Sequence, residues 1–313
     1  MPRKLIVLPD DTAEAIIKPI REASKSIDIR MFLFTSRQLL DAVIAAQSRG
    51  VLVRVMLNPA RRNGVCENEE ARQALQAGGV QVRDSSPDFA LTHQKSMVID
   101  GEVGFVKSLN WEDRNLTETR DYVVSTKDRV ELSEMAQCFN CDWAREPFEP
   151  AANSTLVWCP NNGRARLAAF IDGAKHSLSV QNERYQDMVI IERIVRAVKR
   201  GVHVRIMTKS LHKLKPDQLI EAVGGLRILQ DVGAKVRQLR HLKLHGKVLV
   251  ADDCRAIIGS INLSPGSFDS RRELAIETDG KHVMDRLLNV FDHDWHHAHD
   301  LVLFDEGLLS SIK

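Results

Sequence analysis

Apolar and polar residues along the first half of the chain alternate between helical and strand-like spacing. Apolar residues three to four positions apart predict helices, and short β-rich runs bounded by polar turns predict strands. The predicted elements are helices over 11–25, 37–48, 67–78 and 128–145, and strands over 27–34, 51–57, 80–83, 95–107 and 121–125. Alternating helices and strands followed by hairpin-like strands predict an α/β domain with a mixed sheet and helices on both faces.

The chain contains its own sequence twice. Residues 49–56, Arg-Gly-Val-Leu-Val-Arg-Val-Met, recur at 200–207 as Arg-Gly-Val-His-Val-Arg-Ile-Met, an offset of 151. A repeat of this length indicates two tandem copies of one domain. We place them at 1–150 and 151–313, because the segment 147–154 is short, polar and holds two prolines.

The most polar segment of each copy carries the same kinds of functional group at an offset of 152. These are His93, Lys95, Asp100, Ser108, Asn110 and Asp121 in the first copy, and His245, Lys247, Asp252, Gly259, Ser260, Asn262 and Glu273 in the second. Residues two apart on a strand point to the same side, so the His and Lys of each H-x-K triplet share a face. Each copy therefore presents an imidazole, an ammonium, a hydroxyl and an amide on one surface.

This combination of groups suits a phosphodiester. Lysine, asparagine and serine can bind the phosphate oxygens, so Ser108, Asn110, Ser260 and Asn262 are predicted phosphate ligands beside the two lysines. A neutral imidazole can attack phosphorus, while a protonated one donates to the leaving oxygen. Because each copy supplies only one histidine in this motif, we expect the two copies to face each other across a pseudo-twofold axis.

The residues at these positions resemble the signature of the phospholipase D superfamily, H-x-K-x4-D-x6-G-S-x-N. The second copy matches every specified position, and the first has Lys107 where the signature has glycine. The resemblance covers both halves, 11–146 and 155–299. It implies two tandem phospholipase D-like domains, each a mixed sheet flanked by helices, with the active site at their interface.

By position, the resemblance implies a covalent phosphohistidine on one motif histidine and acid–base catalysis by the other, with no metal or other cofactor. Family precedent favours His93 as the nucleophile and His245 as the acid and then the base, although the sequence itself is symmetric. Lys95 and Lys247 accompany them. Asp121 and Glu273 match the family's acidic partners of the histidines, where a carboxylate holds the tautomer and stabilises the imidazolium.

The remaining motif residues are expected to be structural. Asp100 and Asp252 belong to this group, as does Gly259, because a small residue lets the backbone approach closely. A lysine at the equivalent position 107 is expected either to turn outward or to add a charge to the site.

Composition excludes several classes of protein. Among the 313 residues, 43 % are hydrophobic and 27 % charged, and no apolar run approaches the roughly 20 residues of a membrane span. The N-terminal apolar stretch of four residues is too short for a signal peptide, and the five cysteines lack disulfide-like spacing. We expect a cytoplasmic protein, peripheral if it meets a membrane, with neither a signal peptide nor a transmembrane segment.

The distribution of charge suggests the class of partner. Residues 199–247 hold seven Lys and five Arg against three acidic residues, a local charge of +9 in a chain of net charge +2. Such a block suits nucleic acid, anionic lipid or a small phosphodiester, and a solvated helix face is the alternative. Aromatic residues make up only 5 %, which leaves little for base stacking.

We therefore predict a monomer that hydrolyses or transfers the phosphatidyl group of phospholipids, with contact to an anionic membrane through 199–247. A metal-independent nuclease is the alternative, and a non-catalytic phosphate-binding protein is a third class.

Two further clusters carry less weight. Cys138 and Cys141 form a C-x-x-C on a predicted helix without a second pair, so we expect buried small residues rather than a zinc or redox site. In the segment 292–299, His293 and His297 lie one helical turn apart, where a metal could bridge them, but a packed or solvated helix is the favoured interpretation.

Overall fold

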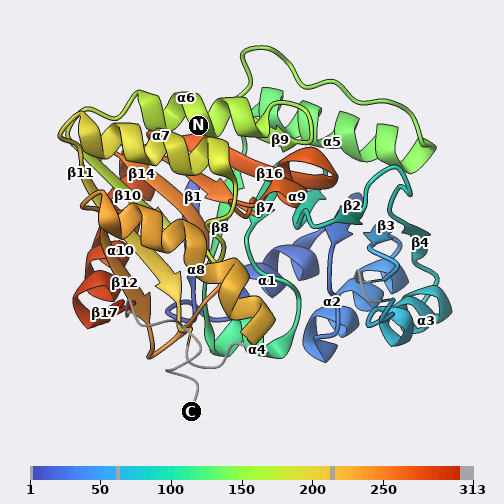
Figure 1. The fold of residues 1–313 in the computed structure, drawn as a ribbon. Helices are drawn as coiled ribbons and strands as arrows, with labels where there is room; N and C mark the ends of the chain where they lie inside the picture. Colours follow the sequence, from blue (N-terminus) through green and yellow to red (C-terminus); the bar gives the residue numbers. More distant parts are fainter. Residues whose placement is uncertain (1–2, 61–63, 212–215, 304–313) are drawn as a thin grey trace.

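The computed structural model describes residues 3–60, 64–211 and 216–303, which form two α/β halves with the same order of elements (Figure 1). The N-terminal half comprises β1 (Lys4–Leu8), α1 (Glu14–Glu22), β2 (Ser26–Met31), α2 (Arg37–Ser48), β3 (Leu52–Leu57), α3 (Glu69–Ala77), β4 (Gln81–Asp84), β5 (Leu91–Thr92), β6 (Ser96–Ile99), β7 (Val103–Lys107), α4 (Asp113–Thr117), β8 (Thr119–Thr126) and α5 (Arg129–Ala144). The C-terminal half comprises β9 (Leu156–Cys159), α6 (Gly163–Asp172), β10 (Ser177–Gln181), α7 (Met188–Lys199), β11 (His203–Lys209), α8 (Pro216–Asp231), β12 (Lys235–Leu239), β13 (Lys243–Leu244), β14 (Lys247–Ala251), β15 (Arg255–Gly259), α9 (Pro265–Asp269), β16 (Arg271–Thr278), α10 (Lys281–His297) and β17 (His299–Asp300).

The predicted α/β class and the internal duplication are confirmed. The helix predicted over 37–48 has these bounds in the structure, and the other predicted helices are present with ends shifted by one to three residues. The first strand and the two-residue strands β5 and β13 were not predicted, because so few residues carry no detectable period.

Each half contains a mixed sheet. Among the described residues, the first sheet has the strand order β1-β8-β7-β6-β2-β3-β4, and the second has β17-β12-β11-β10-β14-β15-β16-β5. Strands β2, β3 and β4 run parallel, whereas β6, β7, β8 and β1 follow as antiparallel neighbours. The second sheet repeats this arrangement.

Apolar residues separate the molecule into layers. One cluster buries α1, α2 and α3 against the outer face of the first sheet, and another buries α6, α7 and α8 against the second. A third cluster joins the inner faces of both sheets, with Val106 and Val124 from one half packed among Val248 and Ile258 of the other. The two sheets therefore share an apolar core, to which α5 and α10 also contribute Leu132 and Leu287.

Two short strands cross between the halves. Strand β5 belongs to the N-terminal half but pairs with β16, where Thr92 lies opposite Arg272. Strand β13 belongs to the C-terminal half but pairs with β8, where Leu244 lies opposite Arg120. Each half therefore completes the sheet edge of the other, and the residue that follows each crossing strand is a motif histidine.

The motif glycine and its lysine counterpart end strands β15 and β7. A Cβ on Gly259 would lie 2.4 Å from Ala275 Cα, so the glycine permits a close approach to strand β16. Lys107 is fully buried, with Nζ 4.2 Å from the centroid of the Trp111 ring and no hydrogen bond to a described residue. Of the two alternatives expected for this lysine, the outward-turned side chain is wrong. Burial lowers its pKa well below the usual value.

We expect Lys107→Met to stabilise the fold. Because burial lowers the pKa of Lys107, the unfolded chain binds more protons below about pH 10, so the stability of the native chain rises with pH. In chemical denaturation at pH 7, the free energy of unfolding of the variant should exceed that of the native chain by more than about 1 kcal/mol. This difference between variant and native chain should become smaller toward pH 10. Lys25→Met, at a largely exposed position, is the control and should leave stability nearly unchanged. A destabilised Lys107→Met would contradict the burial argument.

Candidate active site

His93 is held by the opposite half of the chain. It follows β5, and its backbone N–H donates to Arg272 O at 3.0 Å. Its ring Nδ1 lies 2.9 Å from Glu273 Oε2 and 3.1 Å from Oε1. Burial opposes ionisation of Glu273, but His93 and Lys95 outweigh it and lower the pKa of the carboxyl. An ionised carboxylate accepts a hydrogen bond from Nδ1–H, which leaves Nε2 of His93 as the nitrogen with a free lone pair.

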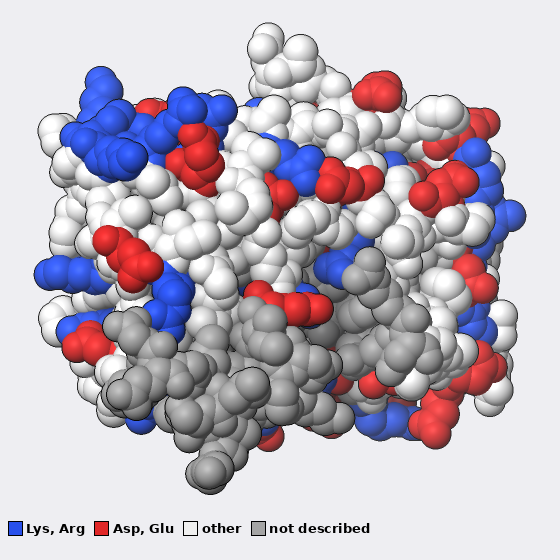
Figure 2. All heavy atoms as spheres, in the orientation of Figure 1, with Lys and Arg blue, Asp and Glu red and all other residues white. Residues whose placement is uncertain are grey.

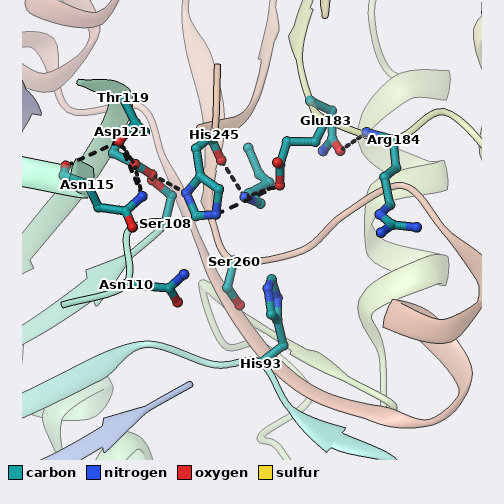
Figure 3. Close-up of polar contacts among 12 residues, drawn as sticks. His93, Ser108, Asn110, Asn115, Thr119, Asp121, Glu183, Arg184, His245 and Ser260 are labelled. Carbon is teal, nitrogen blue, oxygen red and sulfur yellow. Dashed lines mark hydrogen bonds and ion pairs between the residues drawn. The ribbon is translucent and has the colours of Figure 1, made fainter. Parts of the chain in front are cut away.

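His245 is held in the same way by the first half. Its backbone N–H and that of Gly246 donate to Arg120 O at 3.2 and 2.7 Å, and its Nδ1 lies 2.8 Å from Asp121 Oδ1. Burial again opposes ionisation, and the charges of His245 and Lys247 nevertheless lower the pKa of Asp121. Each histidine is therefore oriented by the acid of the other half. Figure 3 shows the rings of His93 and His245 directed into one space.

The two histidines differ in their surroundings. Burial lowers the pKa of His93 to about 3, and the charge of Lys95 adds to this effect although Glu273 opposes it. The edge of the Phe32 ring packs on the ring of His93, with 5.0 Å between the ring centroids. His93 is thus a neutral imidazole near neutral pH.

The motif serines contact the acids. Ser108 Oγ donates to Asp121 Oδ1 at 2.5 Å, and Ser260 Oγ donates to Glu273 Oε2 at 2.6 Å. Each hydroxyl oxygen also accepts a backbone N–H, from Tyr122 and Leu274. Since the single hydroxyl proton is used in this way, the structure places the serines behind the carboxylates, and their contact with phosphate stays a prediction.

Each motif lysine donates to the carbonyl of its own motif histidine, and one motif asparagine, Asn110, lines a cavity together with His245. Lys95 Nζ is fully buried and donates to His93 O at 2.5 Å, and Lys247 Nζ donates to His245 O. Burial lowers the pKa of Lys95 well below its usual value, an effect that a nearby anion would counteract. Asn110 Oδ1 and Asn262 Oδ1 are buried without a hydrogen-bond partner in the described part of the chain.

Asp100 and Asp252 lie away from the histidines, in tight turns. Both have a positive φ, 55° and 54°. Asp100 accepts backbone N–H groups of residues 24–26, and Asp252 those of residues 175–177, at the start of β2 and β10. Their contacts are those of residues that fix the backbone.

Sequence reasoning missed two buried ion pairs. Arg120 binds Asp294 of α10 at 2.7 Å, and Arg272 binds Asp142 of α5 at 3.0 Å. The carbonyl oxygens of these arginines hold the backbone of the motif histidines, so each pair supports a histidine. The internal repeat could have revealed them, because Arg120 and Arg272, like Asp142 and Asp294, are 152 residues apart.

Sequence reasoning also missed Glu183, which follows β10. Its Oε2 lies 2.9 Å from Lys247 Nζ and 3.8 Å from His245 Nε2. Figure 3 shows its carboxylate beside the His245 ring. A cavity of about 370 Å³ opens on this side of His245, lined also by Asn110, Lys209 and Leu244.

The other predicted clusters do not join this site. Cys138 is buried on α5, while His293 and His297 of α10 lie with ring centroids 4.3 Å apart. Among the described residues, no three His, Cys, Asp or Glu side chains are placed to hold a metal ion.

The basic block 199–247 is divided by the fold. Lys247 lies in the site, Lys209 lines the cavity, and Arg205 and Arg237 pair with Asp292 and Asp300. Lys213 and Lys215 lie outside the described residues. Figure 2 shows Lys and Arg side chains interspersed with Asp and Glu on one face. Membrane contact through this block stays a prediction.

A family model described as "Cardiolipin synthase, PLD-like domain" matches the chain twice, over residues 16–143 and 167–295. The chain belongs to this phospholipase D-like family. It is thus an enzyme of the phospholipase D type, and the resemblance of its two motifs is confirmed.

Curated relatives are similar to this chain over most of its length. Cardiolipin synthase B of Shigella flexneri is 26 % identical, with 86 % of this chain and 74 % of the relative covered. Cardiolipin synthase A of Pseudomonas putida (strain F1) is 25 % identical, with coverage of 96 % and 70 %.

The fold of this phospholipase D-like protein is similar to two solved structures. Phosphatidylserine synthase of Haemophilus influenzae has a TM-score of 0.77 at 12 % identity, and the match covers 98 % of this chain and 90 % of that one. Polyphosphate kinase of Porphyromonas gingivalis has a TM-score of 0.74 at 16 % identity, with coverage of 94 % and 47 %. Among the described residues, none of the helices combines the length and the apolar character that a membrane-spanning helix requires.

We expect fragments 1–150 and 151–313 to be inactive alone and to recover part of the activity when mixed. Each fragment holds one of the two motif histidines and lacks the carboxylate that orients it, because Glu273 orients His93 and Asp121 orients His245. Hydrolysis of bis(p-nitrophenyl) phosphate by each fragment and by the mixture measures this. Full activity from either fragment alone would show that the site is not shared.

Proposed function

We propose that this enzyme hydrolyses phospholipids or transfers their phosphatidyl group through a phosphohistidine on His93. The observation that carries the proposal is the pair of histidines facing one space, each oriented at Nδ1 by a carboxylate of the other half. Membership of a family described by cardiolipin synthase supports phospholipid as the substrate.

In the first step, Nε2 of His93 attacks phosphorus. Its lone pair is available because the low pKa keeps the ring neutral and Glu273 holds the other nitrogen as N–H. The P–Nε2 bond forms, the bond from phosphorus to the headgroup oxygen breaks, and His245 Nε2–H gives its proton to that oxygen. Asp121 stabilises His245 while it is cationic.

In the second step, His245 acts as the base. Its Nε2 takes the proton of water or of an acceptor alcohol, whose oxygen attacks phosphorus as the P–N bond breaks. The electron pair returns to His93, and His245 is protonated again for the next cycle. Water gives hydrolysis, and an alcohol gives transfer.

The phosphate would bind between the motif lysines and asparagines. Lys95 is buried, and no carboxylate of the described residues is in direct contact with it, so a phosphodiester anion would compensate the cost of burying its charge. Oδ1 of Asn262 is buried without a hydrogen-bond partner among the described residues, and the NH2 group of the same amide would donate to the anion. The ammonium group of Lys95 would balance the negative charge of the phosphate without a metal ion, and we infer catalysis without one.

The proposal is tested with a labelled phospholipid, and with single-stranded and double-stranded DNA, each in the presence of EDTA. We expect phosphatidic acid from the phospholipid, or a transfer product when an alcohol is added, and no cleavage of DNA. Cleavage of DNA alone would favour the nuclease alternative. Activity abolished by EDTA and restored by one metal would contradict metal-independent catalysis.

A substrate with an activated leaving group should separate the roles of the histidines. A p-nitrophenolate leaves without a proton, and general acid help is worth roughly 10²–10⁴ in rate. Such a substrate should therefore rescue His245→Ala far better than His93→Ala. A phosphoenzyme should form in His245→Ala and be absent from His93→Ala, as followed by acid-quenched labelling. An intermediate trapped on His245 would reverse the assignment, and equal rescue of both variants would reject the division of labour.

A further inference from the structure

The two halves of the active site differ at a pair of equivalent positions beside the motif histidines. Phe32 follows β2 and Glu183 follows β10, and two residues later Phe34 and Tyr185 form equivalent bridges, to Trp111 and Leu263. Phe32 packs on the ring of His93, whereas Glu183 lies against Lys247 and beside His245. One histidine therefore faces an aromatic ring and the other a carboxylate.

A second pair of equivalent positions strengthens this difference. Asn58 is buried, and its side chain is hydrogen-bonded to the backbone. It accepts from Thr92 N–H at 2.9 Å and donates to Ala60 O at 2.6 Å. Its counterpart Lys209, 151 residues later, lines the cavity beside His245 together with Glu183. The second half thus places a carboxylate and an ammonium where the first half has a phenyl ring and a structural amide.

Glu183 is ionised and has an unused acceptor. Burial opposes its ionisation, but Lys247, His245 and Lys209 outweigh it and lower the pKa of the carboxyl. Both contacts of the carboxylate, with Lys247 and with His245, use Oε2, and Oε1 makes no hydrogen bond to any residue that the structure describes. This residue lines the cavity with about a fifth of its side chain exposed.

The structure gives Glu183 no necessary role in holding its neighbours. The ring of His245 is already oriented by Asp121 at Nδ1. The equivalent lysine, Lys95, is fully buried, and the position that corresponds to Glu183 holds Phe32 instead of a carboxylate. The centroid of the Phe32 ring lies 5.2 Å from Lys95 Nζ. The carboxylate is therefore available to a ligand on the side of His245 where the alcohol leaves and enters.

We propose that Glu183 is a specificity-determining residue for the alcohol, selecting one that carries a second hydroxyl group next to the reacting hydroxyl. The second hydroxyl donates to the Glu183 carboxylate while the first gives its proton to His245 Nε2, 3.8 Å away from that carboxylate. Glu183 itself takes no proton. The inference rests on the proposed function, because it concerns the alcohol of the second step.

The surrounding charges favour a neutral hydroxyl over a cationic group as the partner of Glu183. An ammonium headgroup would approach a carboxylate whose negative charge is already balanced by Lys247 and Lys209. The cationic headgroup would then be repelled by these two lysines. A hydroxyl group adds only a hydrogen bond to a charged acceptor, which is among the stronger hydrogen bonds in proteins.

The test compares two alcohols in one tube. The native enzyme and Glu183→Gln are given a labelled phospholipid and equal concentrations of 1,2-propanediol and 1-propanol, and the two transfer products and phosphatidic acid are quantified. All three products come from the same intermediate, so their ratio does not depend on the total rate or on the folded fraction. We expect the native enzyme to prefer the diol and the variant to lose this preference by roughly tenfold or more.

Glu118→Gln is the matched control. Its carboxylate binds Lys243, another residue that lines the cavity, and it undergoes the same chemical change, so the product ratio should stay at the native value. A native enzyme without a preference for the diol overturns the proposal, as does a Glu183→Gln variant that is slower but keeps the native ratio. Absence of every product from the native enzyme would overturn the proposed function, and this inference with it.

Discussion

The site depends on the exchange of two short strands between the sheets. Strands β5 and β13 add to the sheet edge of the opposite half, and each delivers its histidine next to a carboxylate on β16 or β8. A two-residue strand contributes few backbone hydrogen bonds, so the crossing also requires the packed core that joins the inner faces of the sheets. The geometry of catalysis is therefore a property of the interface rather than of either half.

Buried ion pairs reinforce the crossing at the backbone of the two motif histidines. Asp294 holds the guanidinium of Arg120, and Asp142 holds that of Arg272, while the carbonyls of the same arginines bind the backbone at His245 and His93. Loss of one partner of a buried pair leaves an uncompensated charge, which typically costs about 3–5 kcal/mol. The pairs thus couple the position of α5 and α10 to the orientation of the imidazoles.

The sequence was sufficient for the order of the helices and of most strands, for the duplication and for the motif residues, because these depend on local periodicity and on repeated sequence. Strands β1, β5 and β13 were not predicted. The sequence was not sufficient for the partners of the histidines. The repeat places an acidic residue in each copy, but the sequence is compatible with a histidine paired to the carboxylate of its own half or of the other half. The roles of Ser108 and Ser260 behind the carboxylates depend on that pairing, and the burial of Lys107 depends on how Trp111 packs. Glu183 stands outside the motif, and only the comparison with Phe32 reveals it.

The duplication within one chain has a consequence for how this site can specialise. In a symmetric pair of identical subunits, any residue beside one histidine would also stand beside the other. Covalent fusion removes this constraint, because each copy mutates alone. Phe32 and Glu183, or Lys107 and Gly259, are differences that no homodimer of one copy could carry. A donor side and an acceptor side can thus be distinct chemical environments within a frame that is still nearly twofold.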